Sequence, residues 1–244
     1  MPREAWGGEQ VIWTSPKQTP LAFLPVLPKY VDLLDVLTDF GFADTGRRTP
    51  HGEIVLAKRF TPDPAVTNPL EYNVRFGPSA FFPDAQLAHL IPIQPRFSDV
   101  LFPETAPMQS LFPGRHAFGN GIRKAYLCNA PIRTLPVGAP LFFYRSDRER
   151  GIIAVGVLER FMVSRDADQI AREVGRRTVY RFAEIQDLAT RGEVLVLFFR
   201  QSRVLLPYID VRELEAASVI NGLPQSIQRV REEGAKWLYQ RIAA

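Results

Sequence analysis

Apolar runs separated by short turn-forming segments dominate the chain after residue 88 and predict a β-rich fold. Residues 90–104 combine an apolar run, a proline and a helix-like stretch. Residues 119–128 and 138–146 each place a glycine turn before a strand-like segment. Residues 151–163 predict a long strand, and residues 192–200 are continuously apolar, which is typical of a strand buried on both faces.

Helical spacing of apolar residues predicts helices inserted among these strands. Asp166 is an acidic N-cap candidate for a helix that reaches about Gly175, and residues 182–189 and 211–217 predict two more. A last helix is expected to begin at Pro224. One face of that helix would hold Ile227, Val230, Trp237 and Leu238.

The N-terminal part shows a different order of elements: a strand, a helix and a hairpin. Residues 21–30 are strand-like, residues 30–40 have helical spacing with Gly41 as the stop, and residues 53–60 alternate as a strand. The pieces LPKYVDLLDVLTDFGF and GEIVLAKRF resemble the closing third of the GNAT acetyltransferase fold. That family holds acetyl-CoA with a glycine-rich turn that opens a helix. No such turn precedes Leu21, so we expect a partial GNAT-like α/β segment that does not transfer acetyl groups by itself.

Prolines are concentrated between the two parts of the chain. Sixteen of the 21 prolines precede residue 114, and five of them fall in residues 61–83 among short polar and aromatic pieces. This pattern predicts a linker or an irregular wrapping segment. The expected organisation is a partial GNAT-like segment at 1–62, a proline-rich linker at 63–87 and a second domain at 88–244.

The composition is that of a globular protein, with 46% hydrophobic and 11% aromatic residues in 244. Cys128 is the single cysteine and the three histidines are scattered, which excludes an intramolecular disulfide and a cysteine-based zinc site. We expect neither a metal nor a cofactor. No signal-peptide pattern and no apolar run of roughly 18 to 20 residues is present, so we expect no membrane partner and a cytoplasmic location.

The net charge of +4 is unevenly distributed. Residues 88–244 hold 22 Lys and Arg against 16 Asp and Glu, whereas residues 1–87 hold 8 against 10. Of the 30 basic residues 25 are arginine, which suits bidentate contacts with phosphates and bases. A GC-rich genome would explain the arginine excess equally well, so the charge supports nucleic-acid binding only weakly.

Two strand-like segments carry the residues on which the functional interpretation depends. These residues are Arg123, Lys124 and Tyr126 on the first segment, and Tyr144, Arg145 and Ser146 at the end of the second. If the two strands pair, the side chains line a cleft that offers charge, stacking faces and hydrogen-bond donors, which an unpaired base requires. The alternative is that the tyrosines belong to the core and the arginines solvate strand ends.

Eight further residues flank the expected cleft. They are Arg115, His116 and Phe118 on a loop, Arg200, Gln201 and Arg203 at a strand end, and Gln225 and Ser226 at the expected start of the last helix. A helix N-terminus attracts anions because its N–H groups are free. Each set also has an ordinary interpretation: a surface histidine, a solvated strand end and simple helix capping.

The order of these motifs resembles the PUA-like superfamily, in particular its ASCH and EVE branches. The pieces IPIQPRFSDVLF, GIRKAY, VGAPLFFYRS, GIIAVGVLERF and VLVLFFRQ carry the resemblance over roughly residues 88–244. It implies an α+β fold, with a PUA-like twisted β-barrel and inserted helices after the GNAT-like segment. It also implies a binding module for nucleic acid or a modified nucleotide, with RNA or a single-stranded or modified nucleic acid as partner.

Two other functions stay open. Some ASCH proteins are amidohydrolases with a Lys, Thr and Glu set, but aligning Gly121 puts Arg123 in place of the lysine and Tyr126 in place of the threonine. A guanidinium is no general base near neutral pH, so Lys124 with Glu159 or Glu184 would have to substitute. The third possibility is an interaction module that binds an acetyltransferase subunit, or a second copy, through the N-terminal segment. A large apolar patch around residues 33–42 would favour it.

Overall fold

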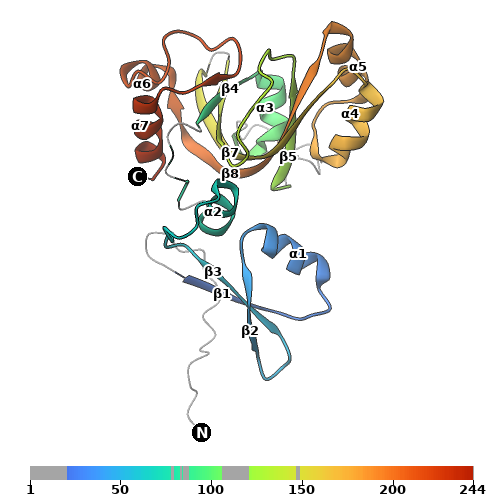
Figure 1. The fold of residues 1–244 in the computed structure, drawn as a ribbon, viewed down its shortest axis with the longest axis vertical. Helices are drawn as coiled ribbons and strands as arrows, with labels where there is room; N and C mark the ends of the chain where they lie inside the picture. The colour runs from blue at the N-terminus through green and yellow to red at the C-terminus, as the bar shows by residue number, and fades with distance from the viewer. Residues whose placement is uncertain are drawn as a thin grey trace. The chain divides into compact units, whose positions relative to one another are not determined.

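The computed structural model describes residues 21–77, 80–82, 84, 88–105, 121–146 and 149–243, which form two compact units that divide between Phe82 and Pro83 (Figure 1). We call the described residues up to Phe82 unit 1 and those that follow unit 2. The expected limits of a separate linker stay a prediction.

Unit 1 is a small three-stranded sheet with two helices. Its elements are β1 (Leu21–Val26), α1 (Val31–Asp39), β2 (Ala43–Arg48), β3 (Ile54–Arg59) and α2 (Pro69–Phe76). The strands are antiparallel in the order β1-β3-β2, and Val26, Phe42 and Leu56 form the buried core. The predicted helix and the strands on either side of it are therefore confirmed.

Gly41 ends α1 for a steric reason. Its φ of +82° lies in the left-handed region, and a Cβ at this position would lie 2.1 Å from the carbonyl oxygen of Val74. Only glycine adopts this φ without strain and has no Cβ to collide with the Val74 carbonyl oxygen.

Part of the expected irregular segment is a helix, α2. The Asn68 side chain accepts a hydrogen bond from the Glu71 N–H at 3.0 Å, and Pro69 occupies the first turn. An Asn N-cap followed by proline is a helix-start signal, so the expectation of an irregular segment at these residues was wrong.

Unit 2 is a mixed α+β domain built on one sheet. Its elements, with η for a 3-10 helix, are β4 (His89–Ile93), α3 (Pro95–Leu101), η2 (Pro103–Thr105), β5 (Arg123–Cys128), β6 (Pro140–Arg145), β7 (Gly151–Ser164), α4 (Ala167–Val174), η3 (Gly175–Arg177), α5 (Phe182–Arg191), β8 (Val194–Asp210), α6 (Val211–Ala216), β9 (Gln228–Arg229) and α7 (Glu232–Ala243). All predicted strands and the first three predicted helices are confirmed. Asp166 caps α4 as expected, since its carboxylate accepts the Gln169 N–H at 3.0 Å.

The sheet has six strands in the order β5-β8-β7-β6-β4-β9. β4 runs parallel to β6, and the other pairs are antiparallel. In the part of the chain that the structure describes the strands do not close into a barrel, which corrects the expected barrel. Strands β5 and β6 do not pair either, because β8 and β7 lie between them.

The sheet nevertheless brings β5 close to β4. The Tyr126 hydroxyl on β5 donates a hydrogen bond to the Pro92 carbonyl oxygen on β4 at 2.9 Å, across the three strands that separate them in the sheet order. This curvature places the ends of β4, β5 and β6 around one hollow.

Aromatic side chains fill the core of unit 2. The rings of Phe143 and Phe199 lie 4.7 Å apart, and a Cβ at Gly156 would come within 2.5 Å of the Phe199 ring. Helices α4 and α5 lie together at one side of the sheet and α6 and α7 at the other (Figure 1).

The last helix begins later than expected. Residues 223–227 are a loop, β9 follows, and α7 starts at Glu232, so Gln225 and Ser226 do not lie at a helix N-terminus. Leu238 is fully buried on α7, as the apolar pattern predicts. Among the helices that the structure describes, none has the length and apolar character needed to cross a bilayer.

Candidate functional site

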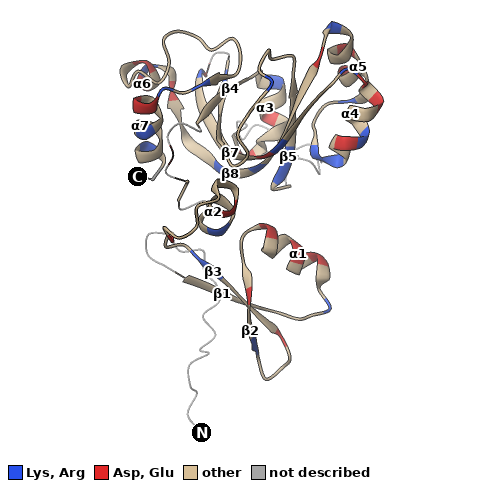
Figure 2. Cartoon of the chain, in the orientation of Figure 1, with Lys and Arg blue, Asp and Glu red and all other residues tan. Residues whose placement is uncertain are grey.

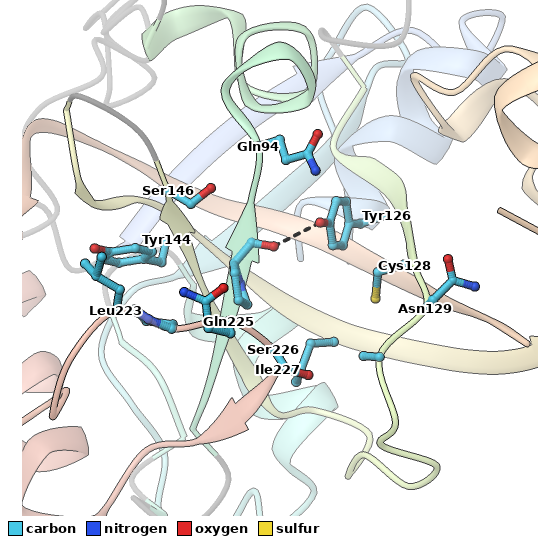
Figure 3. Close-up of a pocket in the computed structure, with 13 residues that line it drawn as sticks. Gln94, Tyr126, Cys128, Asn129, Tyr144, Ser146, Leu223, Gln225, Ser226 and Ile227 are labelled. Atoms are coloured by element: carbon cyan, nitrogen blue, oxygen red, sulfur yellow. Dashed lines mark hydrogen bonds between the residues drawn. The ribbon is translucent and has the colours of Figure 1, made fainter. Parts of the chain in front are cut away.

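A pocket of about 410 Å³ opens where β4, β5 and β6 end and the loop of residues 223–227 passes (Figure 3). Its volume is within the usual range for small-molecule sites. The pocket takes one wall from each strand end, because the curved sheet brings these ends together. The pocket lies at the strand ends around which the sequence interpretation expected a cleft, although β5 and β6 do not pair.

None of the 13 described residues that line the pocket is Asp, Glu, Lys, Arg or His. Cys128 and Tyr126 do not add charge near neutral pH, because burial raises the pKa of the Cys128 thiol to about 11 and that of the Tyr126 hydroxyl far above its usual value. The described lining is therefore neutral, which suits an uncharged polar ligand better than an anion.

The amide side chains of Gln94 and Gln225 and the Ser146 hydroxyl lie at the pocket, whereas the Asn129 amide points away from these side chains (Figure 3). All four residues are exposed. Amides carry a donor and an acceptor on one planar group and can pair with the edge of a base.

Two of the amides are held in place by other parts of unit 2. The Gln94 Oε1 accepts a hydrogen bond from Arg96 Nε at 3.1 Å, which leaves its NH₂ group to donate. The Asn129 Nδ2 donates to the carbonyl oxygens of Leu188 at 3.1 Å and Glu193 at 3.0 Å, which leaves Oδ1 to accept. Gln94 thus offers the pocket an oriented donor, whereas the Asn129 amide is held turned away from it.

Two hydroxyl groups of lining residues are buried without a hydrogen-bond partner among the described residues. They are the Ser226 Oγ and the Tyr144 hydroxyl. A buried hydroxyl without a partner costs roughly 1 to 3 kcal/mol of desolvation. Because neither oxygen is open to solvent, both are a cost to the fold and neither is offered to a ligand.

Tyr126 and Tyr144 line the pocket but present little open surface. Tyr126 is 6% exposed and Tyr144 is fully buried. The Tyr126 ring lies 6.2 Å from that of Phe143 and 6.3 Å from that of Tyr180. The alternative that these tyrosines belong to the core therefore describes their packing. Both residues also line the pocket.

Arg123 and Arg200 lie outside the pocket and share one carboxylate. The Arg123 Nε lies 3.1 Å and the Arg200 Nη2 2.9 Å from the Glu159 Oε1, and Arg123 faces Arg200 across the β5–β8 pair. Ion pairs of this kind neutralise part of the charge that was expected to face phosphates.

Arg145 stabilises the fold and is not placed to contact a ligand at the surface. It is 5% exposed, and its guanidinium donates to Ser98, Glu149, Asp99 and Thr105 at distances between 2.6 and 3.1 Å. The side chain therefore fastens α3 and η2 to β6 and has no donor directed at the pocket.

Lys124 is buried against the end of α3. Its Nζ donates to the Leu101 carbonyl oxygen and lies 5.4 Å from the centre of the Phe102 ring. Burial lowers its pKa to about 8, although the charge of Glu104 acts in the opposite direction. A lysine at a helix C-terminus satisfies a free carbonyl.

Gln201 and Arg203 also bond within the fold. The Gln201 Nε2 donates to Glu104 Oε1 at 3.3 Å, and Arg203 donates to the Ile242 carbonyl oxygen near the end of α7. Burial lowers the pKa of Arg203. Neither residue lines the pocket.

Of the 14 predicted site residues, the structure brings five together at the pocket: Tyr126, Tyr144, Ser146, Gln225 and Ser226. Six lie elsewhere in unit 2: Arg123, Lys124, Arg145, Arg200, Gln201 and Arg203. The remaining three, Arg115, His116 and Phe118, lie outside the described residues.

The sequence interpretation missed Gln94, Asn129 and Leu223 as pocket residues. Gln94 follows the apolar β4 directly, and Asn129 follows β5, so each is a polar residue at the end of a strand. That signal could have located both of them. The position of Leu223 depends on the loop before β9, for which the sequence predicted a turn and the start of a helix.

The proposed amidohydrolase set is not brought together. Lys124 contacts Leu101, Glu159 contacts Arg123 and Arg200, and the Glu184 carboxylate accepts the Arg181 N–H at 2.8 Å. The contacts described for Glu159 and Glu184 are thus with arginines.

No protein-family model and no curated protein matches this chain. Its structure is similar to crystal structures of ASCH from Zymomonas mobilis and of a serine-to-alanine variant of that protein, each with a TM-score of 0.50 and 15% identity over 64% of this chain and 95% and 97% of theirs. A tyrosine-to-phenylalanine variant of the same protein matches with a TM-score of 0.50 and 14% identity, over 63% of this chain and 97% of the variant. Over this part the chain thus shares the fold of these ASCH structures, and nothing in these comparisons supports the GNAT resemblance of unit 1.

Proposed function

We propose that unit 2 binds single-stranded RNA and holds one unpaired base in the pocket. The observation that carries the proposal is the neutral lining with amides and a serine around it, because a base is an uncharged heterocycle that is recognised through hydrogen bonds at its edges. A free nucleotide phosphate would find no cation among the described lining residues.

The base would enter edge first. The Gln94 NH₂ group, the Gln225 amide and the Ser146 hydroxyl supply its hydrogen bonds. Leu223 is a large apolar residue, 43% exposed, beside the same pocket, where it can cover a ring face. The RNA-binding function implied by the PUA-like resemblance supports the same assignment, and a base modification would be read by the same amides.

The test blocks the pocket without disturbing the core. Ser146 is exposed, and Ser146→Trp would fill the pocket entrance. Thr190→Trp on α5 is the matched control, since Thr190 is also exposed and does not line the pocket. Labelled RNA octamers of each base should bind the parent protein with a Kd of about 10⁻⁴ to 10⁻⁶ M near physiological salt.

We expect Ser146→Trp to weaken octamer binding at least about tenfold and Thr190→Trp to leave it unchanged. Equal affinity of both variants, with parent-like melting temperatures, would remove the pocket from the binding site.

A second candidate function is self-association through unit 1. Seven large apolar residues of unit 1 are exposed: Leu21, Phe23, Tyr30, Val31, Leu33, Val36 and Phe40. Exposed large apolar residues that lie together on one face are a common mark of a protein interface. Sedimentation should then show dimers that Leu33→Glu with Val36→Glu converts to monomers, whereas a monomeric parent protein would exclude this function.

A further inference from the structure

A second hollow of about 600 Å³ lies between α3 and residues 175–184. We call it the groove. Phe97 and Tyr180 lie within its lining, with ring centres 4.3 Å apart and an interplanar angle of 28°. Arg96 and Arg181 supply its positive charge, and both are exposed.

The arginines at the groove differ from those on the sheet. Arg96, Arg176, Arg177 and Arg181 are exposed, and none forms an ion pair with a carboxylate of the described chain. The Arg96 guanidinium lies 4.4 Å from the centre of the Phe97 ring, which is stacking that leaves donors available. Figure 2 shows the blue basic positions on α3 and around η3.

One carboxylate, that of Glu184, also lines the groove. It accepts the Arg181 N–H at 2.8 Å and is thereby directed at the start of α5. With Arg96 and Arg181 the lining carries a net charge of +1, and Arg176 and Arg177 on η3 add to it nearby.

The groove is a direct neighbour of the pocket. Gln94 lines the pocket, Arg96 lines the groove, and the two side chains are hydrogen bonded at 3.1 Å. Tyr126 and Tyr180 form the partition, with ring centres 6.3 Å apart. A neutral hollow thus adjoins a positively charged one.

We propose that the groove binds the phosphates of the nucleotides next to the base in the pocket, so that one RNA strand crosses from pocket to groove over Arg96. This inference rests on the proposed function of the pocket. In a nucleic-acid strand an uncharged base is joined to a negatively charged backbone. The neutral pocket suits the base, and the positively charged groove suits the backbone. The exposed arginines contribute phosphate contacts that the paired arginines Arg123, Arg145 and Arg200 do not.

The test separates charge in the groove from charge elsewhere. Arg177→Gln with Arg181→Gln removes two exposed charges at the groove and keeps the Arg96–Gln94 hydrogen bond, and Arg212→Gln with Arg231→Gln removes two exposed charges near α6 and α7. The probes are labelled RNA octamers at several salt concentrations and the four free ribonucleosides.

The groove variant should bind the octamer about tenfold more weakly and flatten the plot of log K against log salt by about 1.4, the value for two phosphate contacts on a single strand. Nucleoside binding should be unchanged, and the α6–α7 variant should match the parent. If the groove variant keeps the parent's affinity and salt slope while Ser146→Trp loses binding, the phosphate-binding role of the groove is overturned and the base pocket is kept. Equal losses in both double variants mean a diffuse charge effect and also overturn it. If the parent binds neither probe, the proposed function fails as well.

Discussion

The Tyr126 hydroxyl donates a hydrogen bond to the Pro92 carbonyl oxygen at 2.9 Å and so joins β5 to β4, two strands with three others between them in the sheet order. The bond lies beside the pocket, since both residues line it. The bond spans the curved sheet at the place where the strand ends come together.

Removing this hydroxyl should cost stability. Tyr126→Phe should lower the free energy of unfolding by about 1 kcal/mol, the usual value for one hydrogen bond, measured by urea denaturation. The matched control is Tyr144→Phe, because the Tyr144 hydroxyl is buried without a partner in the described chain and its loss should be neutral or stabilising. Equal effects of the two substitutions would contradict the role assigned to the Tyr126–Pro92 bond.

Ser226→Ala should raise stability and leave RNA binding unchanged. The variant removes a buried hydroxyl that has no partner among the described residues, so the free energy of unfolding should rise by up to about 1 kcal/mol in urea denaturation. Octamer binding should stay as in the parent, because the oxygen is closed to solvent and therefore to a base. A variant that loses stability would contradict the assignment of Ser226 Oγ as an unpaired group.

Leu223→Ala should weaken RNA binding, because it removes apolar surface at the pocket. The expected loss is roughly 1 kcal/mol, or about fivefold in Kd. Leu206→Ala is the control, since Leu206 is also exposed in unit 2 and lies outside the pocket lining. Anisotropy titrations that give the same loss for both leucines would refute a specific contact at Leu223.

Lys124 should make stability depend on pH in the alkaline range. Its folded pKa of about 8 is below its ordinary value of 10.5, so the unfolded chain binds more protons between these values. Stability contributed by this group therefore rises with pH above about 8. Relative to Lys124→Met, the parent should gain about 1 kcal/mol between pH 7.5 and 9 in urea unfolding. Parallel pH profiles of the two proteins would contradict the lowered pKa, and comparing the two cancels the titration of Cys128.

Most elements of the fold could be predicted from the sequence, because they depend on local signals. The apolar run of β8, the Asp166 cap of α4 and Gly41 after α1 are of this kind. The start of α7 could not be predicted in this way, because a proline such as Pro224 is typical of a first helical turn, whereas residues 223–227 form a loop through tertiary packing. The strand order could not either, because pairing of β5 with β8 is a contact between distant parts of the chain.

The site was predictable in place but not in chemistry. Tyr126, Tyr144 and Ser146 lie where the strand ends predict them, but the neighbouring Arg145 and Arg123 are occupied by Asp99, Glu149 and Glu159. A sequence shows that an arginine is present and does not show which carboxylate reaches it. Gln94 and Asn129 were overlooked although each follows a strand directly, because only their place at a strand end marks them.

The most direct test of the base pocket is to observe its amides while RNA binds. In a titration of ¹⁵N-labelled protein with a single-stranded RNA octamer, the side-chain NH₂ resonances of Gln94 and Gln225 should shift and saturate with the Kd found by anisotropy. The amide of Gln186, exposed on α5 and outside the pocket lining, should not shift. If RNA binds while the resonances of Gln94 and Gln225 stay in place, the base does not enter this pocket.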